Sequence, residues 1–153
     1  TKGSTLDPLA RKALLEINCD YDHGTGHGIG SFLSVHEGPQ RIAKSPEKND
    51  SAIKNGMILS NEPGFYKEGE YGIRIENLII CRLNKNNFLF FETISWAPFD
   101  LDLVDISLLN HEEIEWINDY HKNVFKKISP NLNADEKQWL KSVTSPIVKR
   151  IGT

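Results

Sequence analysis

Apolar and polar positions recur with helical spacing near the start of the chain. In residues 6–17 the apolar positions return every three or four residues, and Asp7-Pro8 is a helix start signal. The pattern predicts one amphipathic helix, with apolar positions at Leu6, Leu9, Ala10, Ala13, Leu14 and Ile17.

Helical spacing returns in the last third of the chain. Asn110 opens a long segment in helical register, and Ser129-Pro130-Asn131 breaks it. Asn133 then caps a shorter predicted helix that ends near residue 143. The apolar face of the long helix is predicted from Ile114, Ile117, His121, Val124 and Ile128.

The middle of the chain has the pattern of β-strands. Its segments are short, rich in Ile, Phe and Tyr, and separated by turn residues at 67–70 and 84–87. We expect antiparallel strands in residues 32–38, 57–66, 71–83 and 88–96, followed by an extended stretch holding Asp102 and Asp105. The predicted fold class is therefore α+β, with one domain in residues 1–99 and a mostly helical extension in residues 100–153.

Composition narrows the classes of function. Hydrophobic residues make up 39% and charged residues 25%, which are ordinary globular values. The net charge of −3, with scattered basic residues, argues against a nucleic-acid partner. No apolar run approaches the roughly 20 residues that a membrane span needs. The only cysteines, Cys19 and Cys81, indicate neither a disulfide framework nor a thiolate zinc site, so we expect a reducing, cytoplasmic location.

Three polar clusters interrupt these apolar segments. Residues 23–30 contain His23, His27 and four glycines, residues 60–64 contain Glu62, and residues 72–77 contain a charged pair. One imidazole and two carboxylates from three segments form a typical partial ligand set for a divalent metal. Each cluster also has a plainer interpretation, since histidines in glycine-rich turns often only cap backbone groups.

The charged pair in residues 72–77 is Arg74 and Glu76. In a strand these two side chains share one face, and Ile73 and Ile75 are expected to pack on the other. Because burying a carboxylate is costly, Glu76 must be solvated, paired with Arg74 or bound to a metal. A surface ion pair would contribute only ~0–1 kcal/mol.

Three motifs carry a resemblance to a known family. The segments YDHGTGHGIGSFLSVHEGP, SNEPGFY and YGIRIEN, in this order, resemble the aminopeptidase P branch of the pita-bread metallopeptidases, in its eukaryotic cytosolic form. The leading helix and the tail also resemble that branch. The resemblance implies the second half of a pita-bread catalytic domain, with a curved antiparallel sheet flanked by helices and a C-terminal helical extension.

The resemblance also implies roles for individual residues. His27, Glu62 and Glu76 would bind metal, and Glu62 would also act as a general base. His36 would contact the scissile carbonyl, His23 would position substrate near its proline, and Arg74 would hold the neighbouring carboxylates.

The implied reaction is removal of the N-terminal residue from peptides with proline at position two. Two divalent metal ions, preferably Mn²⁺ and alternatively Co²⁺ or Zn²⁺, would activate a bridging hydroxide. The family's two aspartate ligands lie upstream of the matched segments, and Asp20, Asp22, Asp102 and Asp105 are not in matching motifs. We therefore expect the upstream half of the domain as a partner, little activity from this chain alone, and a homodimer in the full-length protein.

Two alternatives are left open. A prolidase or a methionine aminopeptidase would use the same fold, although the glycine-rich motif and the long tail fit aminopeptidase P better. A pita-bread module kept only for binding or dimerisation is the other alternative, and it gives no reason for His27, Glu62 and Glu76 to occur together.

Overall fold

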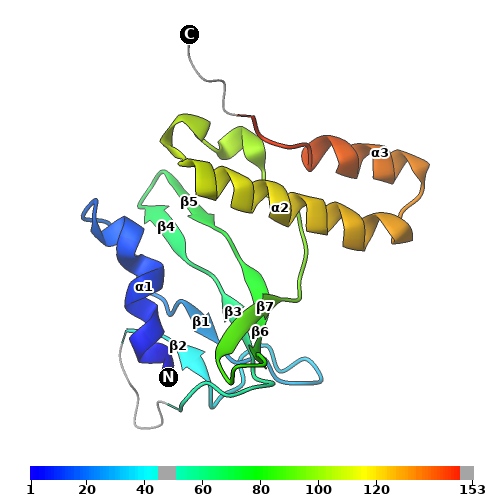
Figure 1. Cartoon of the computed structure of the whole chain (residues 1–153). Helices are drawn as coiled ribbons and strands as arrows, with labels where there is room; N and C mark the ends of the chain where they lie inside the picture. The colour runs from blue at the N-terminus through cyan, green and yellow to red at the C-terminus, as the bar shows by residue number, and fades with distance from the viewer. Residues whose placement is uncertain (45–50, 149–153) are drawn as a thin grey trace. The chain divides into compact units, whose positions relative to one another are not determined.

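The computed structural model describes residues 1–44 and 51–148, which fall into two compact units (Figure 1). The first unit covers residues 1–95 and the second begins at Trp96. Residues 149–153 of the predicted extension lie outside the described residues. Helices and antiparallel strands are both present, as the α+β prediction requires.

The described residues of the first unit form one helix and seven short strands. The helix α1 (Gly3–Leu15) is followed by β1 (Gly26–His27), β2 (Arg41–Ile42), β3 (Ile58–Asn61), β4 (Gly64–Lys67), β5 (Tyr71–Arg74), β6 (Asn77–Leu83) and β7 (Leu89–Thr93).

All strand pairings in the described part of the chain are antiparallel, which confirms the prediction. They form a β1–β2 pair, a three-stranded sheet in the order β3–β6–β7, and a β4–β5 hairpin. The register pairs Leu59 with Ile79, and a single bridge between Gly28 and Leu59 joins β1 to β3. The bridge brings the glycine-rich segment against the three-stranded sheet.

The strand predicted at residues 32–38 is wrong, because this segment is a loop. Phe32 and Leu33 have φ angles of 57° and 68°, which are left-handed values that an extended strand does not allow. The loop is closed by the Gly30 N–H, which donates to the Ser34 carbonyl at 2.8 Å. The short strand β2 lies further along the chain instead.

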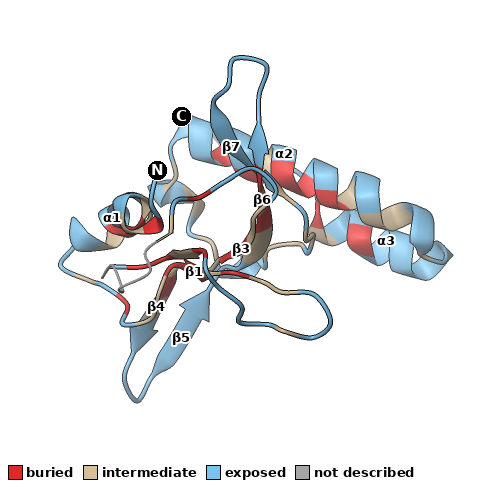
Figure 2. Cartoon of the chain, turned by 90° about the horizontal axis from the view of Figure 1, so that it is seen from below, coloured by how far each residue is buried: buried red, intermediate tan, exposed pale blue. Residues whose placement is uncertain are grey.

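The core of the first unit is small and aliphatic. It consists of Ile42 on β2, Ile53, Leu59 on β3, and Ile79 and Cys81 on β6, and Figure 2 shows that β6 is partly buried. Strand β5 is exposed along its whole length. Ile73 and Ile75 were predicted to pack in a core but are 41% and 52% exposed, so that prediction is wrong for this chain.

Helix α1 was predicted correctly as an element but not in its buried face. It begins at Gly3, before the predicted start at Asp7-Pro8, and its fully buried residues are Gly3, Asp7 and Arg11. Leu9, on the predicted apolar face, is 71% exposed. The helix therefore buries a polar stripe, which is possible because Asp7 and Arg11 form an ion pair four residues apart.

The second unit is helical, as predicted. Two short 3₁₀ turns, η1 (Leu101–Leu103) and η2 (Ile106–Leu108), precede α2 (His111–Ile128), and η3 (Ser129–Asn131) leads to α3 (Ala134–Val143). Asp102 lies inside η1, so the extended stretch predicted there is wrong at this residue, whereas Asp105, which caps η2, does have an extended backbone. The described part of the chain contains no helix with the length and apolar character needed to cross a membrane.

The register predicted for the long helix is confirmed. Its N-terminus carries a capping box between Asn110 and Glu113, and α3 carries a second between Asn133 and Glu136. The buried residues of α2 are Ile114, Ile117, Tyr120, His121 and Val124, whereas Ile128 is only partly buried.

Candidate metal centre and substrate cleft

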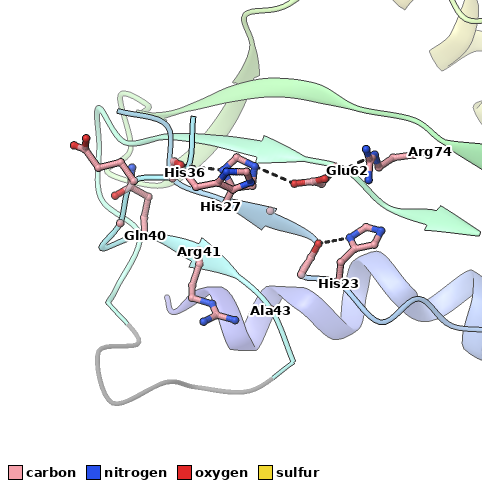
Figure 3. Close-up of a pocket in the computed structure, with 13 residues that line it drawn as sticks. His23, His27, His36, Gln40, Arg41, Ala43, Glu62 and Arg74 are labelled. Carbon is pink, nitrogen blue, oxygen red and sulfur yellow. Dashed lines mark hydrogen bonds and ion pairs between the residues drawn. The ribbon is translucent and has the colours of Figure 1, made fainter. Parts of the chain in front are cut away.

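Strand β1 brings His27 against Glu62 at the end of β3. Strands β1 and β3 approach each other so closely at Gly26 that a Cβ there would lie 2.1 Å from the Ser60 carbonyl oxygen. Glycine is therefore required at this position. The Ser60 hydroxyl accepts the His27 backbone N–H at 2.9 Å and donates to Glu62 Oε1, also at 2.9 Å. The imidazole and the carboxylate are thereby held together, with His27 Nε2 at 3.2 Å from Glu62 Oε1 (Figure 3).

The hydrogen bonds of His27 fix which ring nitrogen carries the proton. Nδ1 lies 3.0 Å from the Gly28 carbonyl oxygen, which can only accept, so Nδ1 is the donor. In the neutral ring Nε2 then presents a lone pair toward Glu62 Oε1. At 3.2 Å, His27 Nε2 and Glu62 Oε1 are close enough to share a proton or to bind one metal ion together.

Glu76, the third predicted metal ligand, is not brought into contact with the other two. Arg74 lies between the carboxylates, with Nε at 3.9 Å from Glu62 Oε2 and at 3.4 Å from Glu76 Oε2. Glu62 is 12% exposed, whereas Glu76 is 42% exposed. Glu76 was expected to be solvated, paired with Arg74 or bound to a metal, and the structure shows the pair with Arg74. Arg74 lies beside both carboxylates, Glu62 and Glu76, as predicted.

The donor set fits a divalent cation in chemistry, although only in part in geometry. An imidazole nitrogen and a carboxylate oxygen in direct contact are suitable ligands for Mn²⁺, Co²⁺ or Zn²⁺. Among residues 1–44 and 51–148, no group of three His, Cys, Asp or Glu side chains converges closely enough to hold a metal. This chain therefore presents a two-ligand corner of a site.

His23 lies on another side of the same cleft. Its Nδ1 donates to the Gly24 carbonyl at 2.8 Å, so Nε2 is free to accept from the Tyr66 hydroxyl, also at 2.8 Å. Tyr66 in turn accepts from Arg74 Nη1 at 3.4 Å, and this bond is the main cause that raises the Arg74 pKa. Tyr66 therefore connects the predicted substrate residue His23 to the predicted support residue Arg74.

Tyr66 was missed by the sequence analysis. It stands opposite Gly72 in the β4–β5 hairpin, and a Cβ at Gly72 would lie 2.7 Å from the Tyr66 ring. A tyrosine facing a glycine across a hairpin was the available sequence signal, but hairpin pairing had to be known before the two could be matched.

His36 reaches the cleft from the loop of residues 30–37. Its ring lies 4.0 Å from the His27 ring, centre to centre. The tip of the loop, Phe32 and Leu33, is 98% and 93% exposed. The cleft has a volume of about 540 Å³, and its lining includes His23, His27, His36, Gln40, Glu62 and Arg74 (Figure 3).

The chain is similar to known proteins over most of its length. Residues 1–82 match metallopeptidase family M24, and residues 87–147 match the C-terminal region of peptidase M24. A probable Xaa-Pro aminopeptidase P of Coprinopsis cinerea is 48% identical over 156 residues, covering 96% of this chain and 25% of the relative. Aminopeptidase P1 of Arabidopsis thaliana is 41% identical over 154 residues, covering 96% of this chain and 24% of the relative.

A solved structure is also similar. The X-prolyl aminopeptidase of Caenorhabditis elegans, described as a cytosolic enzyme with a di-nuclear active site, matches with a TM-score of 0.84 at 39% identity. The match covers 96% of this chain and 25% of that protein. The chain thus spans about a quarter of the length of the relatives it matches.

Proposed function

Because this chain belongs to metallopeptidase family M24, we propose that it supplies part of the active site of an Xaa-Pro aminopeptidase, which removes the N-terminal residue from peptides with proline second. Its fold is the pita-bread fold of the M24 aminopeptidases and prolidases. The observation that carries the proposal is the His27–Glu62 contact at 3.2 Å, which places an imidazole nitrogen and a carboxylate oxygen close enough to share a proton or a metal ion.

We propose that His27, Glu62 and Glu76 bind two divalent ions, of which Mn²⁺ suits the carboxylate-rich set best and Co²⁺ or Zn²⁺ would be alternatives. When bound, such ions lower the pKa of a shared water and polarise the peptide carbonyl. Glu76 would reach them by turning away from Arg74, a half-exposed ion pair that costs little to break.

The chain's own residues would perform the remaining steps. Glu62 accepts the proton released as water adds to the carbonyl carbon, and it returns that proton to the proline nitrogen as the peptide bond breaks. His36 donates a hydrogen bond to the scissile carbonyl oxygen. His23, held by Tyr66, positions the proline side of the substrate, and Arg74 orients the carboxylates.

The other half of the site would come from the upstream half of the domain. This proposal is supported by the partial ligand set and by relatives about four times as long as this chain. We propose that residues 1–99 complete the catalytic domain, that residues 100–153 form its extension, and that the full-length protein is a cytoplasmic homodimer. The C. elegans neighbour, described as cytosolic, supports the location.

The test is manganese-dependent hydrolysis of a peptide with proline second, by this chain alone and by this chain mixed with the upstream half of the domain. Activity is expected only in the mixture, and Glu62→Ala should abolish it. Glu92→Ala is the matched control, because Glu92 also pairs with an arginine on a strand but lies outside the cleft lining. A metal-loaded mixture that cleaves nothing would refute the catalytic proposal and favour a binding or dimerisation module.

Peptide length separates the proposed activity from that of a prolidase. Cleavage of tripeptides and longer peptides is expected, whereas activity confined to dipeptides would reassign the enzyme to the prolidase branch.

A further inference from the structure

Helix α1 buries an ion pair where the sequence pattern predicts an apolar face. Asp7 is fully buried and Arg11 is 2% exposed. Arg11 Nε donates to Asp7 Oδ2 at 2.6 Å, and Nη2 donates to Asp7 Oδ1 at 3.2 Å. A buried ion pair rarely stabilises a protein more than apolar side chains of the same size would. A contribution to stability alone therefore does not explain why Asp7 and Arg11 are buried in α1.

The remaining donors of Arg11 are directed at the segment that carries His23. Nη1 donates to the Tyr21 carbonyl at 2.6 Å, and Nη2 donates to the His23 carbonyl at 2.7 Å. Nη1 also donates to Asp20 Oδ1 at 2.7 Å, and the guanidinium lies 3.7 Å from the centre of the Tyr21 ring. One side chain on α1 thus holds the backbone on both sides of residue 22.

The charge of this cluster is well compensated. Burial opposes the positive charge of Arg11, but the hydrogen bonds to Asp7 and Asp20 prevail and raise its pKa. Lys44 and then Arg11 hold the pKa of Asp20 far below its usual range. Arg11 and Asp20 therefore both stay charged at neutral pH.

A second connection leads from the same ion pair to Glu62. The Thr25 hydroxyl donates to Asp7 Oδ1 at 2.7 Å and lies 2.5 Å from the Tyr21 hydroxyl. The Thr25 carbonyl accepts the backbone N–H of Glu62 at 2.8 Å. The Asp7–Arg11 pair therefore contacts residues 20–25, the segment that carries His23 and whose Thr25 carbonyl is hydrogen-bonded to Glu62.

We propose that Arg11 is a positioning residue, which sets the placement of His23 directly and that of Glu62 through Asp7 and Thr25. The proposal rests on the proposed function, because it concerns substrate and metal groups of that site. A lysine at position 11 would keep the charge but lose the planar fork, and could not reach both carbonyls and Asp7 at once.

The experiment compares Arg11→Lys with Arg82→Lys in the metal-loaded mixture of this chain with the upstream half. Arg82 is the matched control, since it donates to a single carboxylate, Glu92, at 3.0 Å from an exposed position of β6. Loss of outer hydrogen bonds around a ligand commonly lowers activity about 10–100-fold. We expect that loss in kcat/KM for Arg11→Lys and no change for Arg82→Lys.

A second readout is independent of activity. With ¹⁵N-labelled histidine in this chain, the ring resonances of His23 and His27 should shift in Arg11→Lys and stay in place in Arg82→Lys. If Arg11→Lys does not fold, Asp7→Asn, which keeps the size of the side chain, is judged by the same resonances.

The outcomes separate the two proposals. Shifted ring resonances in an assembly that never cleaves peptides would support positioning by Arg11 and refute the proposed function. Unchanged resonances and unchanged kcat/KM in a folded Arg11→Lys protein, even with a lowered unfolding temperature, would assign Arg11 to stability alone and overturn the inference.

Discussion

Ser60 shows how a single hydroxyl can hold two parts of a site. It is fully buried, accepts the His27 backbone N–H and donates to the Glu62 carboxylate. Removal of the hydroxyl leaves a buried N–H without its acceptor and lets the carboxylate rotate. The residue therefore affects both stability and the geometry of the His27–Glu62 pair.

Ser60→Ala should lower the free energy of unfolding by about 1–3 kcal/mol and the proposed activity by about 10–100-fold. Ser95→Ala is the control, because the Ser95 hydroxyl also accepts a backbone N–H, that of Leu78 at 2.7 Å, but lies outside the cleft lining. Denaturant unfolding and peptide hydrolysis measure the two effects. Equal activity losses in both variants would show that Ser60 has no special place in the site.

His121 should make the stability of the second unit depend on pH. It is fully buried, its Nε2 accepts the Phe99 N–H at 2.9 Å, and its Nδ1 has no partner within the described ranges. Burial lowers its pKa below the ordinary 6.5. As the pH falls below 6.5, His121 takes up a proton more readily in the unfolded chain than in the folded one. The free energy of unfolding is therefore highest above pH 6.5 and decreases as the pH approaches the lowered pKa of the folded form.

We expect the free energy of unfolding to fall as the pH drops below 6.5, by at most about 1.4 kcal/mol per pH unit from this one residue. His121→Gln should flatten the profile. Asn123→Ala, at an exposed position of the same helix, removes no titratable group and should leave the slope unchanged. Chemical denaturation at a series of pH values measures the slope, and an unaltered slope in His121→Gln would contradict the assignment.

At the scale of elements, the start of α2 depends on one side chain. Asn110 accepts the Glu113 N–H at 2.9 Å, and Glu113 returns the bond to the Asn110 N–H at 2.8 Å. Asn110→Ala should therefore lower the free energy of unfolding by about 1 kcal/mol. Asn123→Ala, in the exposed middle of the same helix, should cost nothing, because alanine is the better helix former there. Thermal unfolding compares the two, and equal losses would mean that the cap contributes nothing.

The elements differ in how far the sequence predicts them. The face of α2 is predicted because its buried residues are mostly apolar and follow helical spacing. The face of α1 is not, because hydrophobic periodicity carries no information about a buried Asp7–Arg11 pair. The loop of residues 30–37 is rich in strand-forming residues, and only its left-handed backbone angles, which a sequence does not reveal, distinguish it.

At the scale of the whole molecule, the sequence motifs predict which residues line the cleft better than they predict which side chains meet as metal ligands. His23, His27, His36, Glu62 and Arg74 line one cleft, as their motifs led us to expect. Glu76 pairs with Arg74 and does not join Glu62, because its side-chain direction in the connection between β5 and β6 depends on packing that motif spacing does not encode. The metal-ligand roles themselves stay a prediction.

Metal should therefore stabilise the complete assembly more than this chain alone. A manganese concentration one hundred times Kd adds about 2.7 kcal/mol to the stability of a protein that binds only when folded. We expect a clear rise in the unfolding temperature of the mixture and a small one for the chain alone, both removed by Glu62→Gln. Differential scanning calorimetry gives the comparison, and an equal rise in Glu62→Gln would place the metal elsewhere.

The left-handed backbone at Phe32 and Leu33 has a consequence for protein engineering. Each such angle costs a residue with a side chain roughly 1–2 kcal/mol, a cost that glycine does not carry. Replacing Phe32 or Leu33 with glycine should therefore raise the unfolding temperature. The same replacement would loosen the segment that holds His36 over the cleft, so greater heat resistance and fast turnover place opposite demands on this loop.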